Sequence, residues 1–254
     1  MKNNFADFLL NISKSLKEKN GLFIIIDDIN GLSKTSEFPN WYKGLSETID
    51  FSDNFVPVAF TLVSYKENFN KLTTLNPSFS RIFHLIEIDH LNDEDIELFF
   101  IENFEKYSIR FENKKALKHM VYYSWGMPLV MQQIGEETFW NVKNDLISEE
   151  IVFKSVLNAS IELGNKQISL ILDQIENDEY ENILLKLGKH KLIEFEISDI
   201  KEILNDKENE ILNEFLLRME ELNILEHVGK KIKERYTFTN RLYFVYFLIK
   251  ANIN

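Results

Sequence analysis

The stretch Phe23-Ile24-Ile25-Ile26-Asp27-Asp28 decides the fold class of this 254-residue chain. A short uninterrupted apolar run that is rich in β-branched residues predicts a strand buried on both faces, as the strands of parallel sheets are. Carboxylates directly after such a strand lie at the carboxyl end of the sheet, in the crevice where α/β proteins bind ligands. Asp27 and Asp28 are therefore the first candidates for a functional site, although paired aspartates also begin turns.

Two further runs extend the predicted sheet. Residues 56–64 (VPVAFTLVS) are apolar until Ser64, and residues 81–88 (RIFHLIEI) alternate as an edge strand does. Residues 37–49 can supply a crossover helix between the first two strands, and residues 5–16 carry apolar side chains at helical spacing. The order helix, strand, helix, strand, strand predicts an α/β fold with a three-stranded parallel sheet.

The sequence changes character after residue 91. Asn92 is a good N-cap, and no strand signal interrupts the helices that we expect over residues 93–106, 113–124, 127–141 and 149–163. These helices form an all-helical subdomain, and Gly164-Asn165-Lys166 is a candidate boundary after it.

The last ninety residues follow a different plan. We expect helices near residues 180–187, 198–204 and 211–222, a hairpin of residues 224–228 and 234–239, and a buried helix over 240–250. Three helices followed by a two-stranded wing are the order of a winged helix-turn-helix. We therefore predict a helix-dominated chain with domains at residues 1–91, 92–163 and 164–254.

Composition excludes several classes of function. The chain has no cysteine, which excludes disulfides, thiolate metal sites, iron–sulfur clusters and a cysteine nucleophile. A net charge of −12 disfavours a surface that attracts nucleic acid globally. The longest apolar run covers residues 242–249, far short of the ~18–20 residues that cross a bilayer, and no secretory signal is visible. We therefore expect a cytoplasmic protein with no membrane association.

Several motifs together give the chain a family resemblance. Residues 23–28 resemble the Walker B strand of P-loop ATPases, and Ser64 stands where AAA+ enzymes carry a polar sensor of the γ-phosphate. Arg81 precedes the third predicted strand, as in an arginine-finger region. Trp125-Gly126-Met127-Pro128 is similar to the Gly-x-Pro lid signature of STAND-type and archaeal origin-recognition-type ATPases. With the trailing winged helix, the resemblance covers nearly the whole chain.

The resemblance implies a role for each motif in an intact parent protein. Asp27 would coordinate the Mg²⁺ of bound ATP, and Asp28 would polarise the attacking water. Ser64 would sense the γ-phosphate, and Arg81 would compensate charge on a neighbouring site. Gly126, Met127 and Pro128 would line the adenine, in the lid that covers the base.

Each of these residues also has a purely structural interpretation. Ser64 can simply end a strand, and Arg81 can be a solvated surface charge. Pro128 is a common first residue of a helix, after a glycine that ends the previous one. From Tyr122 to Gln133 the lid carries no positive charge, whereas origin-type relatives often carry a sensor arginine there.

The chain departs from the family in lacking the P-loop, Gly-x-x-x-x-Gly-Lys-Ser/Thr, whose amides cradle the phosphates. It therefore looks like the carboxyl-terminal part of such an ATPase, beginning just before Walker B. We expect a nucleotide-dependent switch that binds ATP weakly or not at all on its own and hydrolyses little. Because the missing strand is central in the family, exposed strand edges favour a protein partner or self-association.

The winged helix leaves alternative functions open. Residues 199–226 hold nine acidic and three basic side chains, a poor match for a DNA groove. The wing and the strand after it carry the candidate DNA contacts Lys230, Lys231, Lys233 and Arg235. The alternatives to the switch are a winged-helix DNA-binding regulator and a protein-interaction scaffold with a vestigial ATPase core.

Overall fold

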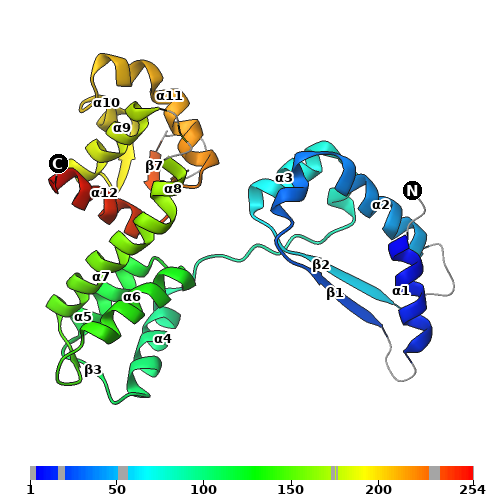
Figure 1. Cartoon of the computed structure of the whole chain (residues 1–254), viewed down its shortest axis with the longest axis horizontal. Helices are drawn as coiled ribbons and strands as arrows, with labels where there is room; N and C mark the ends of the chain where they lie inside the picture. Colours follow the sequence, from blue (N-terminus) through cyan, green and yellow to red (C-terminus); the bar gives the residue numbers. More distant parts are fainter. Residues whose placement is uncertain are drawn as a thin grey trace. The chain divides into compact units, whose positions relative to one another are not determined.

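The computed structural model describes residues 4–16, 21–50, 57–172, 175, 177–228 and 235–253. The chain forms two compact units, Met1–Ile88 (unit 1) and Asp89–Asn254 (unit 2). Figure 1 shows the elements of both units and labels the α-helices and the strands β1, β2, β3 and β7. In the part of the chain that the structure describes, no helix is long and apolar enough to cross a membrane.

Unit 1 is a two-stranded parallel sheet with helices packed on it. Its elements are α1 (Asn4–Ser15), β1 (Leu22–Ile26), the 3₁₀ helix η1 (Ile29–Lys34), α2 (Glu37–Asp50), β2 (Val58–Leu62), α3 (Lys66–Leu75) and the 3₁₀ helix η2 (Phe79–Arg81). The parallel pairing joins Leu22 to Val58 and Ile26 to Leu62. The structure thus confirms the first two strands, their parallel pairing and the crossover helix between them.

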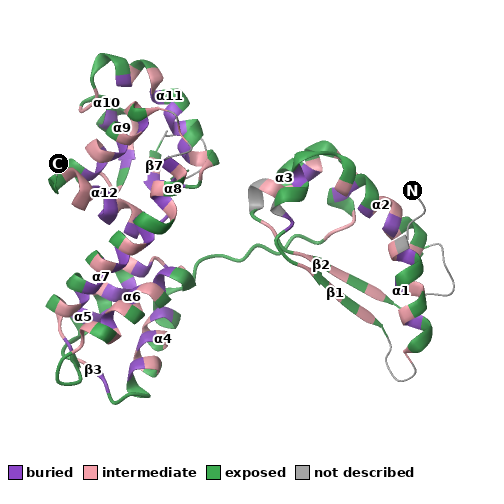
Figure 2. Cartoon of the chain, viewed as in Figure 1, coloured by how far each residue is buried: buried purple, intermediate pink, exposed green. Residues whose placement is uncertain are grey.

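The sheet of unit 1 is covered on one face only. Leu22, Ile24 and Phe60 pack against α1 and α2, whereas Phe23 is 68% exposed and Ile25 is 59% exposed on the opposite face. Figure 2 shows this alternation along both strands. The prediction of strands buried on both faces is therefore wrong, because the described helices of unit 1 all supply side chains to the same face.

The predicted third strand, residues 81–88, is also wrong. Arg81 ends η2, and residues 82–88 form no ladder with β1 or β2. The phenyl rings of Phe79 and Phe83 lie 6.0 and 4.8 Å from the ring of Tyr42, centroid to centroid. Phe83 therefore belongs to an aromatic cluster on α2, and among the described residues of unit 1 no strand pairs with residues 82–88.

The first part of unit 2 is helical, as predicted. Its elements are α4 (Asp93–Glu105), β3 (Arg110–Phe111), α5 (Lys114–Ser124), α6 (Pro128–Asn141), β4 (Leu146–Ile147), α7 (Glu149–Leu163), the π-helix η3 (Gly164–Ile168) and α8 (Ser169–Leu172). The four predicted helices are confirmed to within one residue at each end. Side-chain caps explain the accuracy, since Asn92, Asn113 and Ser148 each accept a hydrogen bond from the first turn of the following helix. The parallel two-residue pair β3–β4 was not expected.

The remaining elements of unit 2 are α9 (Asp178–Lys189), β5 (Glu194–Glu196), α10 (Ile197–Lys201), α11 (Asp206–Glu221), β6 (Leu225–His227), β7 (Arg235–Phe238) and α12 (Arg241–Ile253). The two predicted strands of the hairpin are present as the antiparallel pair β6 and β7, and residues 229–234 between them lie outside the described residues. The unexpected β5 completes an antiparallel sheet in the order β5-β7-β6.

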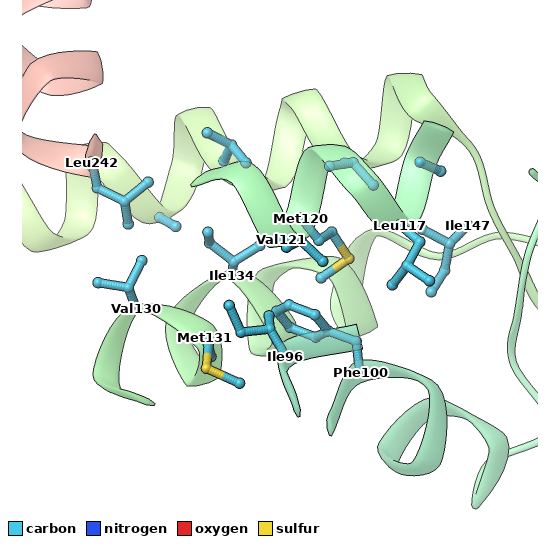
Figure 3. Close-up of a cluster of buried hydrophobic side chains, with 14 of the residues drawn as sticks. Ile96, Phe100, Leu117, Met120, Val121, Val130, Met131, Ile134, Ile147 and Leu242 are labelled. Atoms are coloured by element: carbon cyan, nitrogen blue, oxygen red, sulfur yellow. The ribbon is translucent and has the colours of Figure 1, made fainter. Parts of the chain in front are cut away.

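Helix α12 joins the two parts of the unit 2 core. Leu242 and Val245 belong to the cluster formed with α4–α7, and Phe247 belongs to the cluster formed with α9 and α11. Figure 3 shows the first cluster, with Phe100, Met120 and Ile134 between the helices and Leu242 at one side. The chain runs helically through the candidate boundary at Gly164-Asn165-Lys166, because η3 links α7 directly to α8.

Tyr42 should lower the stability of unit 1 at alkaline pH. Burial, with a smaller contribution from Asp50, raises the pKa of its phenol from 10.0 to about 12. The unfolded chain ionises this group near pH 10, so the free energy of unfolding is unaffected below that pH and falls between about pH 10 and pH 12. Urea unfolding followed by the fluorescence of Trp41, in a Trp125→Phe/Trp140→Phe variant, measures this. Tyr42→Phe should abolish the part of the decrease in unfolding free energy between about pH 10 and pH 12 that is due to Tyr42. Tyr65→Phe, which changes an exposed tyrosine, should leave that decrease as it is.

Candidate functional site

Asp27 and Asp28 lie at the carboxyl end of the parallel strand pair, as the sequence predicts. The ladder continues past both strands, because Val63 N donates to Ile26 O (2.9 Å) and Ile29 N donates to Val63 O (3.1 Å). Asp28 has φ 54° and ψ 51°, in the left-handed region, and its amide donates to Asp27 Oδ1 at 2.9 Å. This turn directs the chain out of the strand into η1 and leaves both aspartates exposed.

Ser64 follows the neighbouring strand at the same edge of the sheet. It comes directly after Val63, which the ladder ties to Ile26 and Ile29, so Ser64 and the two aspartates follow adjacent strand ends. The Ser64 hydroxyl donates to Tyr65 O at 3.1 Å. The structure thus brings together three of the four residues that the sequence places in the unit 1 site.

The donor chemistry at this edge fits Mg²⁺ better than a transition metal. Two carboxylates and a hydroxyl are hard oxygen ligands, and Mg²⁺ is commonly held by one or two carboxylates together with waters and substrate phosphates. The described residues contain no cluster of three or more histidine, cysteine, aspartate or glutamate side chains that could hold a metal by themselves. A cation here would depend on phosphate oxygens for part of its coordination.

Arg81, the fourth predicted residue, is not at a strand end. It is the exposed last residue of η2, and its backbone amide donates to Ser78 O at 3.2 Å. Since the strand that it was expected to precede is missing, its alignment with an arginine-finger region loses its structural basis.

Gly126, Met127 and Pro128 form a sharp bend between α5 and α6 in unit 2. Trp125 (φ 54°) and Gly126 (φ 70°) are both left-handed, and Pro128 is the first residue of α6. Leu91 N donates to Gly126 O at 3.0 Å, and a Cβ on Gly126 would stand 2.5 Å from Leu91 O. Only glycine combines this backbone conformation with this close approach.

Arg241 lies beside this bend and is not among the site residues that the sequence predicts. The guanidinium of Arg241, the first residue of α12, lies over the rings of Tyr122 and Trp125. It helps to line a cavity of about 480 Å³ together with Leu91, Asp93, Glu97, Lys118, Val121, Tyr122, Trp125 and Gly126. Two cations, Lys118 of α5 and Arg241, therefore line this cavity, and Arg241 comes from a helix that begins 119 residues after Tyr122.

The candidate DNA contacts in the predicted wing divide into two groups. Lys230, Lys231 and Lys233 lie outside the described residues. Arg235 is described, and its Nε is 2.7 Å from Glu194 Oε1 across the pairing of β5 with β7. This ion pair already engages the Arg235 charge within the protein.

Solved structures that resemble this chain include the AAA+ ATPases ORC2 and RuvB. The ORC2 protein of Aeropyrum pernix, in ADPNP and ADP complexes, matches with a TM-score of 0.58 over 98% of this chain and 69% of its own, at 11% identity. The RuvB Holliday junction branch migration motor of Thermotoga maritima matches with a TM-score of 0.48 over 90% of this chain and 70% of its own, at 17% identity. No protein-family profile and no curated protein sequence matches the chain significantly. At these identities the likeness to ORC2 shows the fold alone.

The Gly126 bend can be tested by substitution. Gly126→Ala should lower the free energy of unfolding of unit 2 by at least about 2 kcal/mol, because it adds left-handed strain and a clash with the Leu91 backbone. Urea unfolding followed by circular dichroism measures this. Gly135→Ala is the matched control. Gly135 lies within α6, and a Cβ there would meet the Phe100 side chain of α4 at an ordinary contact distance of 3.6 Å. That control should be neutral or stabilising by about 0.5–1 kcal/mol, and an equal loss in both variants would contradict the interpretation.

Proposed function

We propose that this chain is part of a nucleotide-dependent switch of the AAA+ type. In this proposal Asp27 holds the Mg²⁺ of a bound nucleoside triphosphate, Asp28 orients a water molecule, and Ser64 lies near the γ-phosphate. The observation that carries the proposal is the position of the three residues at the carboxyl ends of two adjacent parallel strands, where α/β proteins bind ligands. The fold shared with ORC2, whose structure holds ADPNP and ADP, supports it.

The phosphate-binding half of such a site is not in these residues. The sequence contains no Gly-x-x-x-x-Gly-Lys-Ser/Thr, so no backbone cradle compensates the phosphate charge. Asp27 and Asp28 repel a triphosphate unless a cation lies between them, because all of these groups are anionic. We therefore propose weak, magnesium-dependent binding and negligible hydrolysis by the 254 residues alone.

Nucleotide titration tests this role of Asp27. A fluorescent ATP analogue should bind the full chain only in the presence of Mg²⁺, and Asp27→Asn should weaken binding at least about tenfold because it removes a charged ligand. Asp7→Asn removes the same charge from the first turn of α1 and should leave binding unchanged.

Two results would count against the proposal. Equal binding with and without Mg²⁺, or no binding at millimolar nucleotide, contradicts a magnesium–triphosphate site at Asp27. Magnesium-dependent release of phosphate that Asp27→Asn abolishes contradicts the expectation of negligible hydrolysis.

We further propose that the uncovered sheet face of unit 1 binds a second copy of the chain. Phe23, Ile25, Ala59 and Thr61 are all exposed on this face, and none of them carries a charge. Two copies with a net charge of −12 each repel one another, so a neutral apolar face is the surface that best tolerates its own copy.

Light scattering tests the self-association. The mass should rise above that of the monomer with concentration, and Phe23→Lys should restore the monomer because it places a charge in the apolar contact. This substitution also reduces the net negative charge of each copy, so a stronger overall repulsion between the two acidic copies could not explain dissociation. Leu98→Lys, at an exposed position of α4, is the control and should leave association unchanged. A monomer at every concentration contradicts the proposal.

We propose that DNA is not the partner of the C-terminal helices and sheet. Arg235 is paired with Glu194, and α11 carries five acidic residues that are not buried, namely Asp206, Glu210, Glu214, Glu220 and Glu221. We propose that the C-terminal helices and sheet form a winged helix that contacts protein.

A further inference from the structure

The Arg241 side chain makes three contacts at the end of α5. Its Cζ lies 3.7 Å from the ring centroid of Tyr122 and 3.6 Å from that of Trp125. Its Nη1 donates a hydrogen bond to the backbone oxygen of Tyr122. Both ring distances are well inside the roughly 6 Å over which a cation is attracted to an aromatic face. One side chain of α12 therefore contacts both aromatic residues that flank the end of α5.

The position of Arg241 on its own helix is unfavourable for a cation. It is the first residue of α12, where the positive end of the helix macrodipole repels a positive charge. Burial removes water from the guanidinium and lowers its pKa, although Tyr122, Asp93, Tyr123 and Glu194 act in the opposite direction. The other helix also compensates this placement, because the carbonyl that Arg241 contacts lies in the last turn of α5, at the negative end of that macrodipole.

The bend that Arg241 touches is itself under strain. Trp125 has a left-handed backbone (φ 54°), which is uncommon for a bulky residue and persists only where the surroundings enforce it. The same bend holds Leu91 through its bond to Gly126 O, and the ring of Trp125 lies 6.4 Å from that of His90, edge to face. A change in the Trp125 conformation would therefore reach the segment that leads into unit 2.

The start of α12 is fixed to the C-terminal sheet. Thr239 N donates to Ile224 O at 3.1 Å, and the Thr239 hydroxyl donates to Asn223 O at 2.7 Å. Asn240 then caps α12, since its Oδ1 accepts from Leu242 N at 2.8 Å. The backbone of Arg241 is thereby held next to β6 and β7, and its side chain reaches the bend.

We propose that Arg241 is a positioning residue that couples the Trp125–Pro128 bend to the C-terminal sheet of unit 2. With the guanidinium between α12 and the two rings, the left-handed bend and the start of α12 form one rigid element. When the contact is lost, Trp125 is free to leave the left-handed conformation, and the bend and the C-terminal sheet move independently. The coupling rests on contacts within unit 2 and does not depend on nucleotide binding.

Hydrogen exchange of single amides tests this coupling in the full chain. Arg241→Met keeps much of the apolar stem and removes the charge, and it should speed exchange of the Leu91 and Met127 amides about tenfold or more. Arg241→Lys restores the charge without the planar guanidinium and should give an intermediate rate. The amide of Val152, which bonds to Ser148 O at the start of α7, is the internal control and should not change.

A spectroscopic signature separates positioning from general stability. In a Trp41→Phe/Trp140→Phe background, the remaining Trp125 should be quenched more by acrylamide after Arg241→Met than with Arg241 in place. Coupling is reciprocal, so Trp125→Leu should speed exchange of the Thr239 amide on the other side of the contact. Unchanged bend amides in Arg241→Met, or an equal increase at Val152, would overturn the proposal.

Discussion

The parallel hydrogen bonding between β1 and β2 is the constraint on which the candidate site depends. In-register pairing from Leu22–Val58 to Ile26–Leu62 makes the two strands end at the same edge of the sheet. The bonds of Val63 with Ile26 and Ile29 then fix where the chain leaves each strand. This backbone register places Asp27, Asp28 and Ser64 after adjacent strand ends, and the Ser64 hydroxyl donates to Tyr65 O. A slip of the pairing by one residue would separate the acids from the hydroxyl and reverse the covered face.

The sequence predicts those elements that are specified by residues within their own segment. Three helices of residues 93–163 follow the capping residues Asn92, Asn113 and Ser148, and the fourth begins with Pro128, so each start is specified locally. The prediction of the third strand is wrong for the opposite reason, because a strand depends on a pairing partner elsewhere in the fold. Alternation in residues 81–88 is compatible with a strand only if a neighbour offers its edge, and Phe83 packs instead on the ring of Tyr42. A strand pattern specifies a face, whereas pairing depends on the rest of the fold.

The same distinction separates the site residues that were predicted from the one that was missed. Asp27 and Asp28 follow an apolar run directly, so their position could be inferred from a six-residue window. Arg241 acts on Tyr122 and Trp125 more than a hundred residues away, and nothing near residue 241 marks it as more than the start of an apolar helix. Contacts between a cation and aromatic rings leave no local sequence pattern, because they depend on how α5 and α12 pack.

The number of acidic residues in α11 overestimates the negative charge on its surface. Glu208 counts among the acids of this helix, yet it is 1% exposed, pairs with Lys186 and accepts a hydrogen bond from Asn205 N at 2.7 Å. It is therefore a capping and ion-pairing residue of the core and contributes little to the field at the surface. The remaining acids still disfavour a phosphate backbone. The pair of Arg235 with Glu194 is half-exposed and adds little to this argument.

The two units differ in how much of their apolar surface is covered. Helix α12 contributes residues to both clusters of the unit 2 core, whereas the described residues of unit 1 leave Phe23 and Ile25 exposed. Exposed apolar residues on neighbouring strands favour contact with a partner surface. This uncovered face belongs to the same sheet whose carboxyl edge carries the candidate site.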